Sequence, residues 1–183
     1  MNKKATVLGL SLLVAVSSHA ATIGGIALPK EHGDLELHGA GILRKGFFFN
    51  IYLGALYLQS ADHASNILED VPKRLDIHYF HNTPKKHMIR VAEKTLQKNL
   101  SDEEYKRVKA DADRLHSAYL DGQKGSVASI THVPGQGLTY SVDGRHVITI
   151  QCDTFAKAYF SVWFGEKPSS ETMKSRLLEK LDA

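Results

Sequence analysis

The chain lacks several features that would indicate a familiar function. Its 183 residues include one cysteine, Cys152, so no intramolecular disulfide can form. This cysteine ends the β-branched run VITIQC, where we expect a buried, unreactive thiol. Neither the G-x-S-x-G motif of serine nucleophiles nor a G-x-G-x-x-G phosphate loop occurs. Basic and acidic residues number 23 and 20, and this near balance does not predict a nucleic-acid partner.

Long apolar runs are also scarce, and the one at the N-terminus is short. Lys3 and Lys4 precede an apolar segment at 7–16, and Ser18-His19-Ala20 then places small residues where a signal peptidase reads the chain. The apolar segment is far shorter than the roughly 20 residues that a membrane span requires. We therefore expect residues 1–20 to be a secretory signal peptide, and residues 21–183 to be one exported, periplasmic domain with no membrane span.

Apolar and alternating runs predict a β-sheet. Residues 34–39 alternate between polar and apolar, and residues 47–58 form a longer strand whose two faces are both largely apolar. Such a strand is expected to be central and covered on both sides. A further strand is predicted at 74–80, and residues 127–151 are typical of a three-strand meander with a hairpin turn at Asp143-Gly144.

Helical spacing of apolar residues and capping signals predict the remaining elements. The predicted helices are a short one at 62–70, one at 83–99 capped by Thr83, one after the capping box of Ser101 and Glu104, one capped by Asp153, and a last one capped by Ser169 or Ser170. Strands joined mainly by short turns, with helices grouped between and after them, predict an α+β domain. We expect a large antiparallel sheet with helices packed on one face.

Histidines are plentiful, yet their spacing does not predict a metal site. The closest pair in a strand is His78 and His81, and residues three apart on a strand project to opposite faces. His81 and His87 flank a helix start, with no Asp, Glu or Cys that completes a ligand set. We therefore expect neither a metal nor another cofactor.

The most informative stretch is 37–58, which is almost entirely glycine, aromatic or aliphatic. Arg44 lies just before its longest apolar run. A guanidinium is charged at any relevant pH, so near an apolar surface it either binds an anion or carbonyl group or lies at the rim in water. Tyr52 follows eight residues later, and a hairpin would bring both residues to one cavity. The pattern alone leaves a ligand site and a surface arginine equally open.

Three segments in order resemble the chalcone isomerase-like proteins, including their bacterial exported branch. The segments are 39–58, with G-A-G, Arg44, F-F-F-N-I-Y and G-A-L-Y-L; 72–80, PKRLDIHYF; and 155–168, FAKAYFSVWFGEKP. The resemblance implies an open-faced β-sandwich with a pocket between the sheet and its helices. It also implies that Arg44 is the family arginine, which stabilises charge on a ketone in the plant enzymes. Tyr52 falls where fatty-acid-binding members carry a tyrosine that helps the arginine hold a carboxylate.

Three functions remain open at this point. The first is a periplasmic domain that binds a small apolar, fatty-acid-like carboxylate or carbonyl ligand through Arg44 and Tyr52, without efficient flavonoid cyclisation. The second is an isomerase, an intramolecular lyase that acts by oxa-addition, with Arg44 as the catalytic residue. The third is a non-catalytic structural or adaptor protein whose own side chains fill the pocket. The sequence identifies no protein partner.

Overall fold

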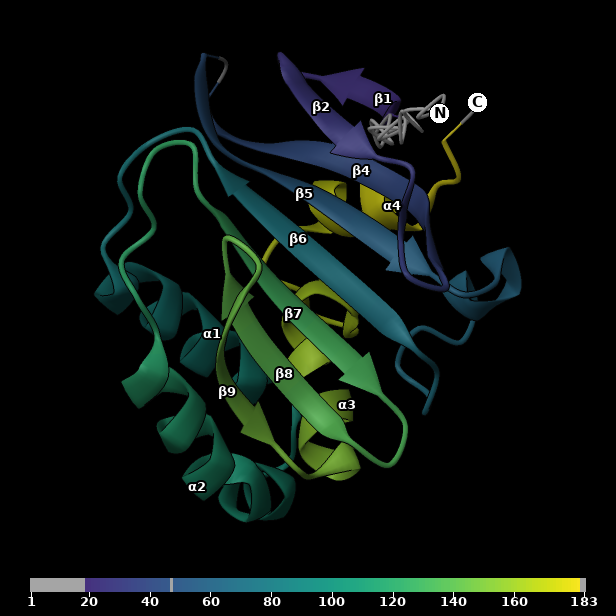
Figure 1. Ribbon diagram of the computed structural model, residues 1–183. Helices are drawn as coiled ribbons and strands as arrows, with labels where there is room; N and C mark the ends of the chain where they lie inside the picture. Colours follow the sequence, from purple (N-terminus) through teal and green to yellow (C-terminus); the bar gives the residue numbers. More distant parts are fainter. Residues whose placement is uncertain (1–18, 47, 182–183) are drawn as a thin grey trace, which may run out of the picture.

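The computed structural model describes residues 19–46 and 48–181 as a layered α+β structure (Figure 1). The elements are β1 (His19–Ile23), β2 (Ile26–Pro29), β3 (Glu31–His32), β4 (Leu35–Lys45), β5 (Phe49–Leu58), a 3-10 turn η1 (Ala61–Ala64), β6 (Lys73–Tyr79), α1 (Lys85–Asn99), α2 (Asp102–Ala118), β7 (Val127–Val133), β8 (Gly137–Val142), β9 (Arg145–Ile150), α3 (Asp153–Phe164) and α4 (Glu171–Leu178). The predicted signal peptide lies, except for its last two residues, outside the described residues, and its cleavage stays a prediction. Within the described ranges no helix has the length and apolar character of a membrane span.

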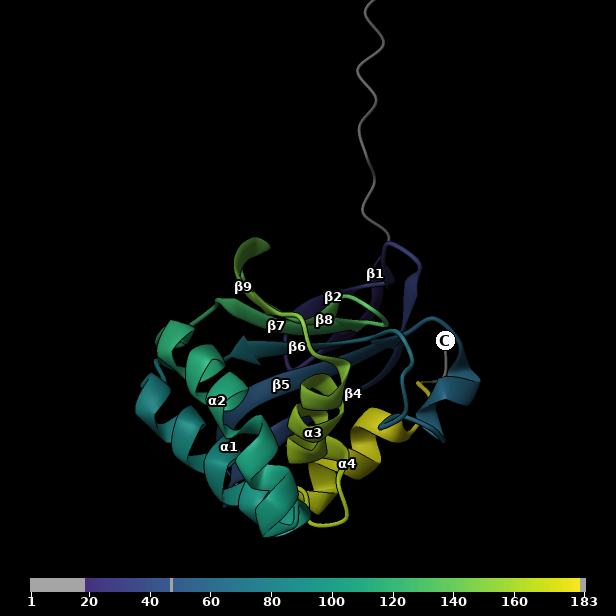
Figure 2. The same cartoon turned by 90° about the horizontal axis from the view of Figure 1, so that it is seen from below.

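The main sheet has seven strands in the order β3-β4-β5-β6-β7-β8-β9, and every neighbouring pair is antiparallel. Figure 2 shows the helices on one face of this sheet and the small β1–β2 sheet on the other. The predicted fold class is therefore confirmed. The β1–β2 hairpin was not expected from the sequence, although Gly24 and Gly25 at its turn both adopt positive φ angles.

Strand β5 is covered on both faces, as its composition predicts. Leu56 and Leu58 belong to the large core between the sheet and the helices, together with Phe155 of α3. Leu53 and Tyr57 belong to a smaller core beneath β1 and β2. Burial on both sides explains why this strand has no polar face.

The prediction of a helix at 62–70 is wrong, because only the 3-10 turn η1 forms there. The hydroxyl of Ser65 donates to the carbonyl of Asp62 at 2.8 Å, and the hydroxyl of Ser60 accepts from the N–H of Asp62. Such local side-chain bonds compete with helical backbone bonds. A segment this short has too few helical bonds to offset them.

Two of the four predicted caps are confirmed, and those of α1 and α3 are wrong. Ser101 and Glu104 form the capping box of α2, and the hydroxyl of Ser170 caps α4. Thr83 does not cap α1, because its hydroxyl donates to the carbonyl of His81. The N–H of Lys85 instead donates to the Asp121 carboxylate at 2.7 Å. This cap is supplied from another part of the chain, so a local pattern could not reveal it.

The start of α3 also differs from the prediction. The cap is Cys152, whose sulfur accepts from the N–H of Phe155 at 3.4 Å, and this cysteine is partly exposed rather than buried. Asp153 is the first residue of the helix. Its carboxylate accepts from the N–H groups of Gly135 and Gly137, both at 3.1 Å, and so holds the β7–β8 turn against α3.

Candidate functional site

Strand β4 is an edge strand along most of its length. Strand β3 pairs only with Leu35 and Glu36, and the described residues give the rest of this edge no strand partner. The C-terminal segment closes one end of the edge. There the N–H of Leu181 donates to the carbonyl of His38 at 2.8 Å, and Nε2 of His38 bonds to the carbonyl of Leu178 at 3.0 Å. The edge is open toward Arg44.

The G-A-G motif of β4 allows α4 to pack directly on the strand. A Cβ at Gly39 would lie 2.2 Å from the carbonyl oxygen of Leu177, and one at Gly41 would lie 2.7 Å from Cβ of Arg176. Both distances are shorter than any ordinary van der Waals contact. Glycine at these positions therefore lets the stem of Arg176 lie across β4.

A hollow of about 450 Å³ opens beside Arg44, where β4, β1 and α4 meet. Figure 1 shows these three elements together at the β4 edge of the sheet. The volume falls within the range of small-molecule sites. The lining combines apolar side chains with two cations and consists of Ile23, Ala40, Gly41, Ile42, Leu43, Arg44, Ser170, Thr172, Met173, Arg176 and Leu181. No acidic residue occurs among these described lining residues.

Arg44 and Arg176 keep most of their hydrogen-bonding capacity. Both side chains are exposed, and Nε of Arg44 donates to Oδ1 of Asn50 at 3.1 Å. Among the residues that the structure describes, no carboxylate pairs with either guanidinium. Two charged groups with donors to spare thus line one partly apolar hollow, an arrangement suited to an anionic head group.

Tyr52 does not lie directly opposite Arg44. In the register of β4 and β5, Leu43 is opposite Tyr52 and Arg44 is opposite Asn50, with Ile51 as an extra residue on β5. Tyr52 packs against the large core and does not line the hollow. The structure therefore brings Arg44 together with Arg176, a residue that sequence reasoning missed. Tyr52 lies next to Leu43 on the neighbouring strand, outside the lining of the hollow.

The Tyr52 hydroxyl is held in a protonated state. Burial raises the pKa of Tyr52 to about 12, and a hydrogen bond from the side chain of Trp163 acts in the opposite direction. At neutral pH this hydroxyl can donate a hydrogen bond but cannot serve as a base.

The space between the sheet and α3 contains tyrosines whose hydroxyl groups are paired. The hydroxyls of Tyr119 and Tyr159 lie 2.5 Å apart, and Nε2 of His116 lies 3.2 Å from the second of them. The hydroxyl of Tyr79 donates to the sulfur of Met88. Burial raises the pKa of Tyr119 and of Tyr159 well above the ordinary value, so both remain protonated. These tyrosines are buried between the sheet and α3, whereas the hollow at the β4 edge is open to the surface and includes Arg44.

A buried polar cluster lies on the opposite face of the sheet. Asp76 is 2 % exposed, accepts from Nε of Arg74 at 2.7 Å and lies 3.1 Å from Nε2 of His32. Burial raises the pKa of Asp76, but His32, Arg74 and Ser129 outweigh burial and hold this pKa below its ordinary value. The cluster thereby ties β3, β6 and β7 together.

Among the described residues, two groups of histidine and carboxylate side chains are close enough to share a metal ion, and in one of them the histidine already has a structural role. In one group, Nδ1 of His132 faces the carbonyl of Gly137 at 2.9 Å, and Nε2 lies 2.8 Å from Oδ1 of Asp70. Both ring nitrogens therefore already have hydrogen-bond partners. Sequence reasoning missed the groups because their members are far apart in the chain; they are Asp70, His132 and Asp153, and Glu93, Asp113 and His116.

Comparison with known proteins agrees with this architecture. A solved structure of a fatty-acid binding protein from Arabidopsis thaliana is similar, with a TM-score of 0.67 and 12% sequence identity over 86% of this chain and 95% of that chain. At this identity the similarity establishes the shared fold. A search of curated proteins gives no match. The sequence profile described as chalcone isomerase-like matches residues 20–179. Because this match spans most of the sequence, the chain belongs to the chalcone isomerase-like family.

Proposed function

We propose that the chain is an exported binding domain whose hollow at the β4 edge takes a small apolar molecule with a carboxylate group. The observation that carries this proposal is that Arg44 and Arg176 line one partly apolar hollow, without an acidic side chain among its described lining residues. The apolar part of the ligand would lie along Ile42 and Leu181. Export rests on the sequence pattern of residues 1–20.

A carboxylate fits the two cations better than a neutral carbonyl does. A guanidinium can donate two parallel hydrogen bonds to a carboxylate, and a hydrogen bond to a charged group contributes about 1.5–3 kcal/mol. The similar Arabidopsis protein is named for fatty-acid binding, which supports a fatty-acid-like ligand as the first choice. Tyr52 would not contact the ligand and would instead help to position Leu43, which lies opposite it in register and lines the hollow.

Binding is favoured over isomerisation by the polar side chains beside the hollow. Ser170 and Thr172 are the polar uncharged residues of the described lining, and neither His, Asp nor Glu occurs there. General base catalysis of oxa-addition by a phenol uses a side chain that accepts the phenol's proton. Since Tyr52 stays protonated at neutral pH, it does not supply this base.

Native mass spectrometry of the mature protein, with a fatty acid added, tests this proposal. The wild type is expected to retain the ligand, and Arg44→Ala and Arg176→Ala are expected to lose it. Arg145→Ala is the matched control, because Arg145 is an exposed arginine on β9, at the opposite edge of the sheet. A wild type without bound ligand, or equal retention by all four proteins, would contradict the proposal.

A further inference from the structure

The turn between β4 and β5 exposes more aromatic surface than its surroundings. Phe48 is 98% exposed and Phe49 is 50% exposed, so Phe48 is the most exposed large apolar side chain that the structure describes. Figure 1 shows this turn at the upper end of the sheet, beyond the ends of β6 and β7. The ring of Phe49 stacks on the ring of His81, with 4.5 Å between the ring centroids. This contact braces the turn against the chain that follows β6. Two neighbouring exposed aromatic side chains on a braced turn make this turn a candidate interaction surface.

The charged residues of the β4–β5 hairpin itself have one sign. The hairpin sequence 37–58 contains Arg44 and Lys45 but neither Asp nor Glu. Both cationic side chains are exposed, directly before the aromatic residues. The overall charge balance of the chain does not predict an anionic partner, but this local distribution does.

We propose that the β4–β5 turn inserts into an anionic lipid surface, with Phe48 in the interface and Lys45 among the head groups. Aromatic side chains favour the membrane interface, and basic residues beside it are attracted to anionic lipids. A protein partner fits less well, because a stable protein interface buries about 800 Å² on each side and a narrow turn supplies little of that area.

Insertion at this turn would bring the hollow to the lipid surface. Arg44 lines the hollow and lies two residues before Gly46, where the turn begins. The mouth of the hollow would then face the head-group layer, in which the carboxylates of fatty acids lie. The insertion itself depends on Phe48 and Lys45 and is independent of whether the hollow holds a ligand.

Sedimentation with vesicles tests the proposal on the full mature chain. Vesicles of phosphatidylcholine alone are compared with an equimolar mixture of phosphatidylcholine and phosphatidylglycerol. The wild type is expected to bind the anionic vesicles, Phe48→Ser to weaken this binding about tenfold or more, and Lys45→Gln to weaken it about fivefold. Thermal unfolding of both variants is measured alongside, so that a loss of vesicle binding is interpreted only for a folded protein.

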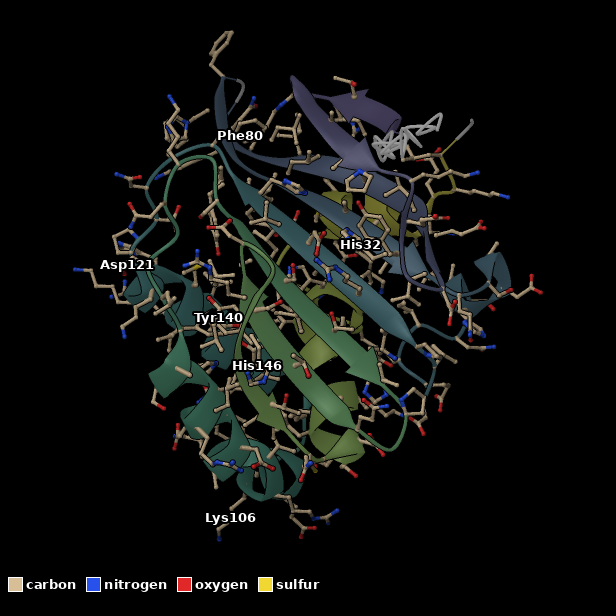
Figure 3. All side chains as sticks on the ribbon, in the orientation of Figure 1. His32, Phe80, Lys106, Asp121, Tyr140 and His146 are labelled. Carbon is tan, nitrogen blue, oxygen red and sulfur yellow. The ribbon has the colours of Figure 1, made fainter. Side chains whose placement is uncertain are left out.

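Matched controls remove a similar group from another part of the surface. Val91→Ser removes a half-exposed apolar side chain from α1. Lys106→Gln removes an exposed cation from α2. Phe80 marks the region of the β4–β5 hairpin, because its N–H donates to the carbonyl of Ile51 in β5. Figure 3 shows Lys106 at the opposite end of the molecule from Phe80. Both control variants are expected to bind anionic vesicles like the wild type.

The depth of insertion gives an independent readout. Trp163, the one tryptophan of the chain, is 7% exposed, so brominated lipids should leave wild-type fluorescence unchanged. Phe48→Trp is expected to be quenched by them. Absence of vesicle binding by the wild type, binding that survives Phe48→Ser, or an unquenched Phe48→Trp would each overturn the insertion proposal. Retention of a fatty acid in solution by Phe48→Ser, but not by Arg44→Ala, separates this test from that of the binding function.

Discussion

Adding one methyl group at Gly39 is expected to destabilise the chain strongly, because the new atom meets backbone rather than side chain. The Cβ of Gly39→Ala would lie 2.2 Å from the carbonyl oxygen of Leu177 and 2.7 Å from that of Glu179. Relief of this contact requires α4 to move from β4 by roughly 1 Å. Such overpacking costs about 2 kcal/mol. The shift also breaks the two hydrogen bonds of His38 to Leu178 and Leu181, each worth about 1 kcal/mol. We therefore expect a loss of about 4 kcal/mol in the free energy of unfolding.

Gly54→Ala is the matched control on the neighbouring strand. Its Cβ would lie 3.3 Å from the sulfur of Met173 and 3.4 Å from Cδ2 of Leu177, which are the ends of flexible side chains. We expect a loss below about 1 kcal/mol. Urea unfolding followed by circular dichroism measures both values. Equal losses for the two variants would refute the close packing of α4 on β4, and with it the placement of Arg176 at the hollow.

Three further predictions concern charged groups and catalysis. Asp76→Asn should lower the free energy of unfolding by roughly 3 kcal/mol at neutral pH, because Arg74 loses its buried partner. Since the pKa of Asp76 is lowered in the folded state, the difference in unfolding free energy between the wild type and Asp76→Asn should be full above about pH 4 and shrink below it. Urea unfolding above and below this pH checks this, and a pH-independent difference contradicts it. Burial lowers the pKa of Lys73 to about 8, so an NMR titration should show its side chain losing a proton near that pH, whereas a midpoint above about 10 would contradict the burial argument. Mixed with 2'-hydroxychalcone, the protein should leave the rate of absorbance loss at the buffer value, because none of the described residues that line the hollow is a base; an Arg44-dependent acceleration would instead establish the isomerase.

The parts of the fold that were predictable depend on signals a few residues apart. The two apolar faces of β5, the capping box of α2 and the Asp143-Gly144 turn are all local patterns, and all three form. The cap of α1 is not local, because Asp121 follows the whole of α1 and α2. The short β1–β2 hairpin gains its stability from the core beneath it, so its own sequence is a weak signal.

Of the two arginines at the candidate site, only Arg44 could be predicted, because only Arg44 has a local sequence signal. Arg44 could be found because a permanent cation next to a long apolar run is unusual in any sequence. Arg176 lies among charged residues on a short terminal helix, where the sequence indicates an ordinary solvated side chain. Only the contact of α4 with Gly41 brings it to the hollow. The predicted neighbour of Arg44, Tyr52, shares its hairpin, but the extra residue Ile51 alters the register between them.

The most direct test of the binding account is the ratio of dissociation constants for dodecanoate and dodecanol, measured by calorimetric titration. The two ligands share an apolar chain and differ in the head group that Arg44 and Arg176 are proposed to hold. The account predicts that the wild type binds dodecanoate about tenfold to a hundredfold more tightly, and that this preference disappears in Arg44→Ala and Arg176→Ala but not in Arg145→Ala. Equal affinity of the wild type for the two ligands would contradict it.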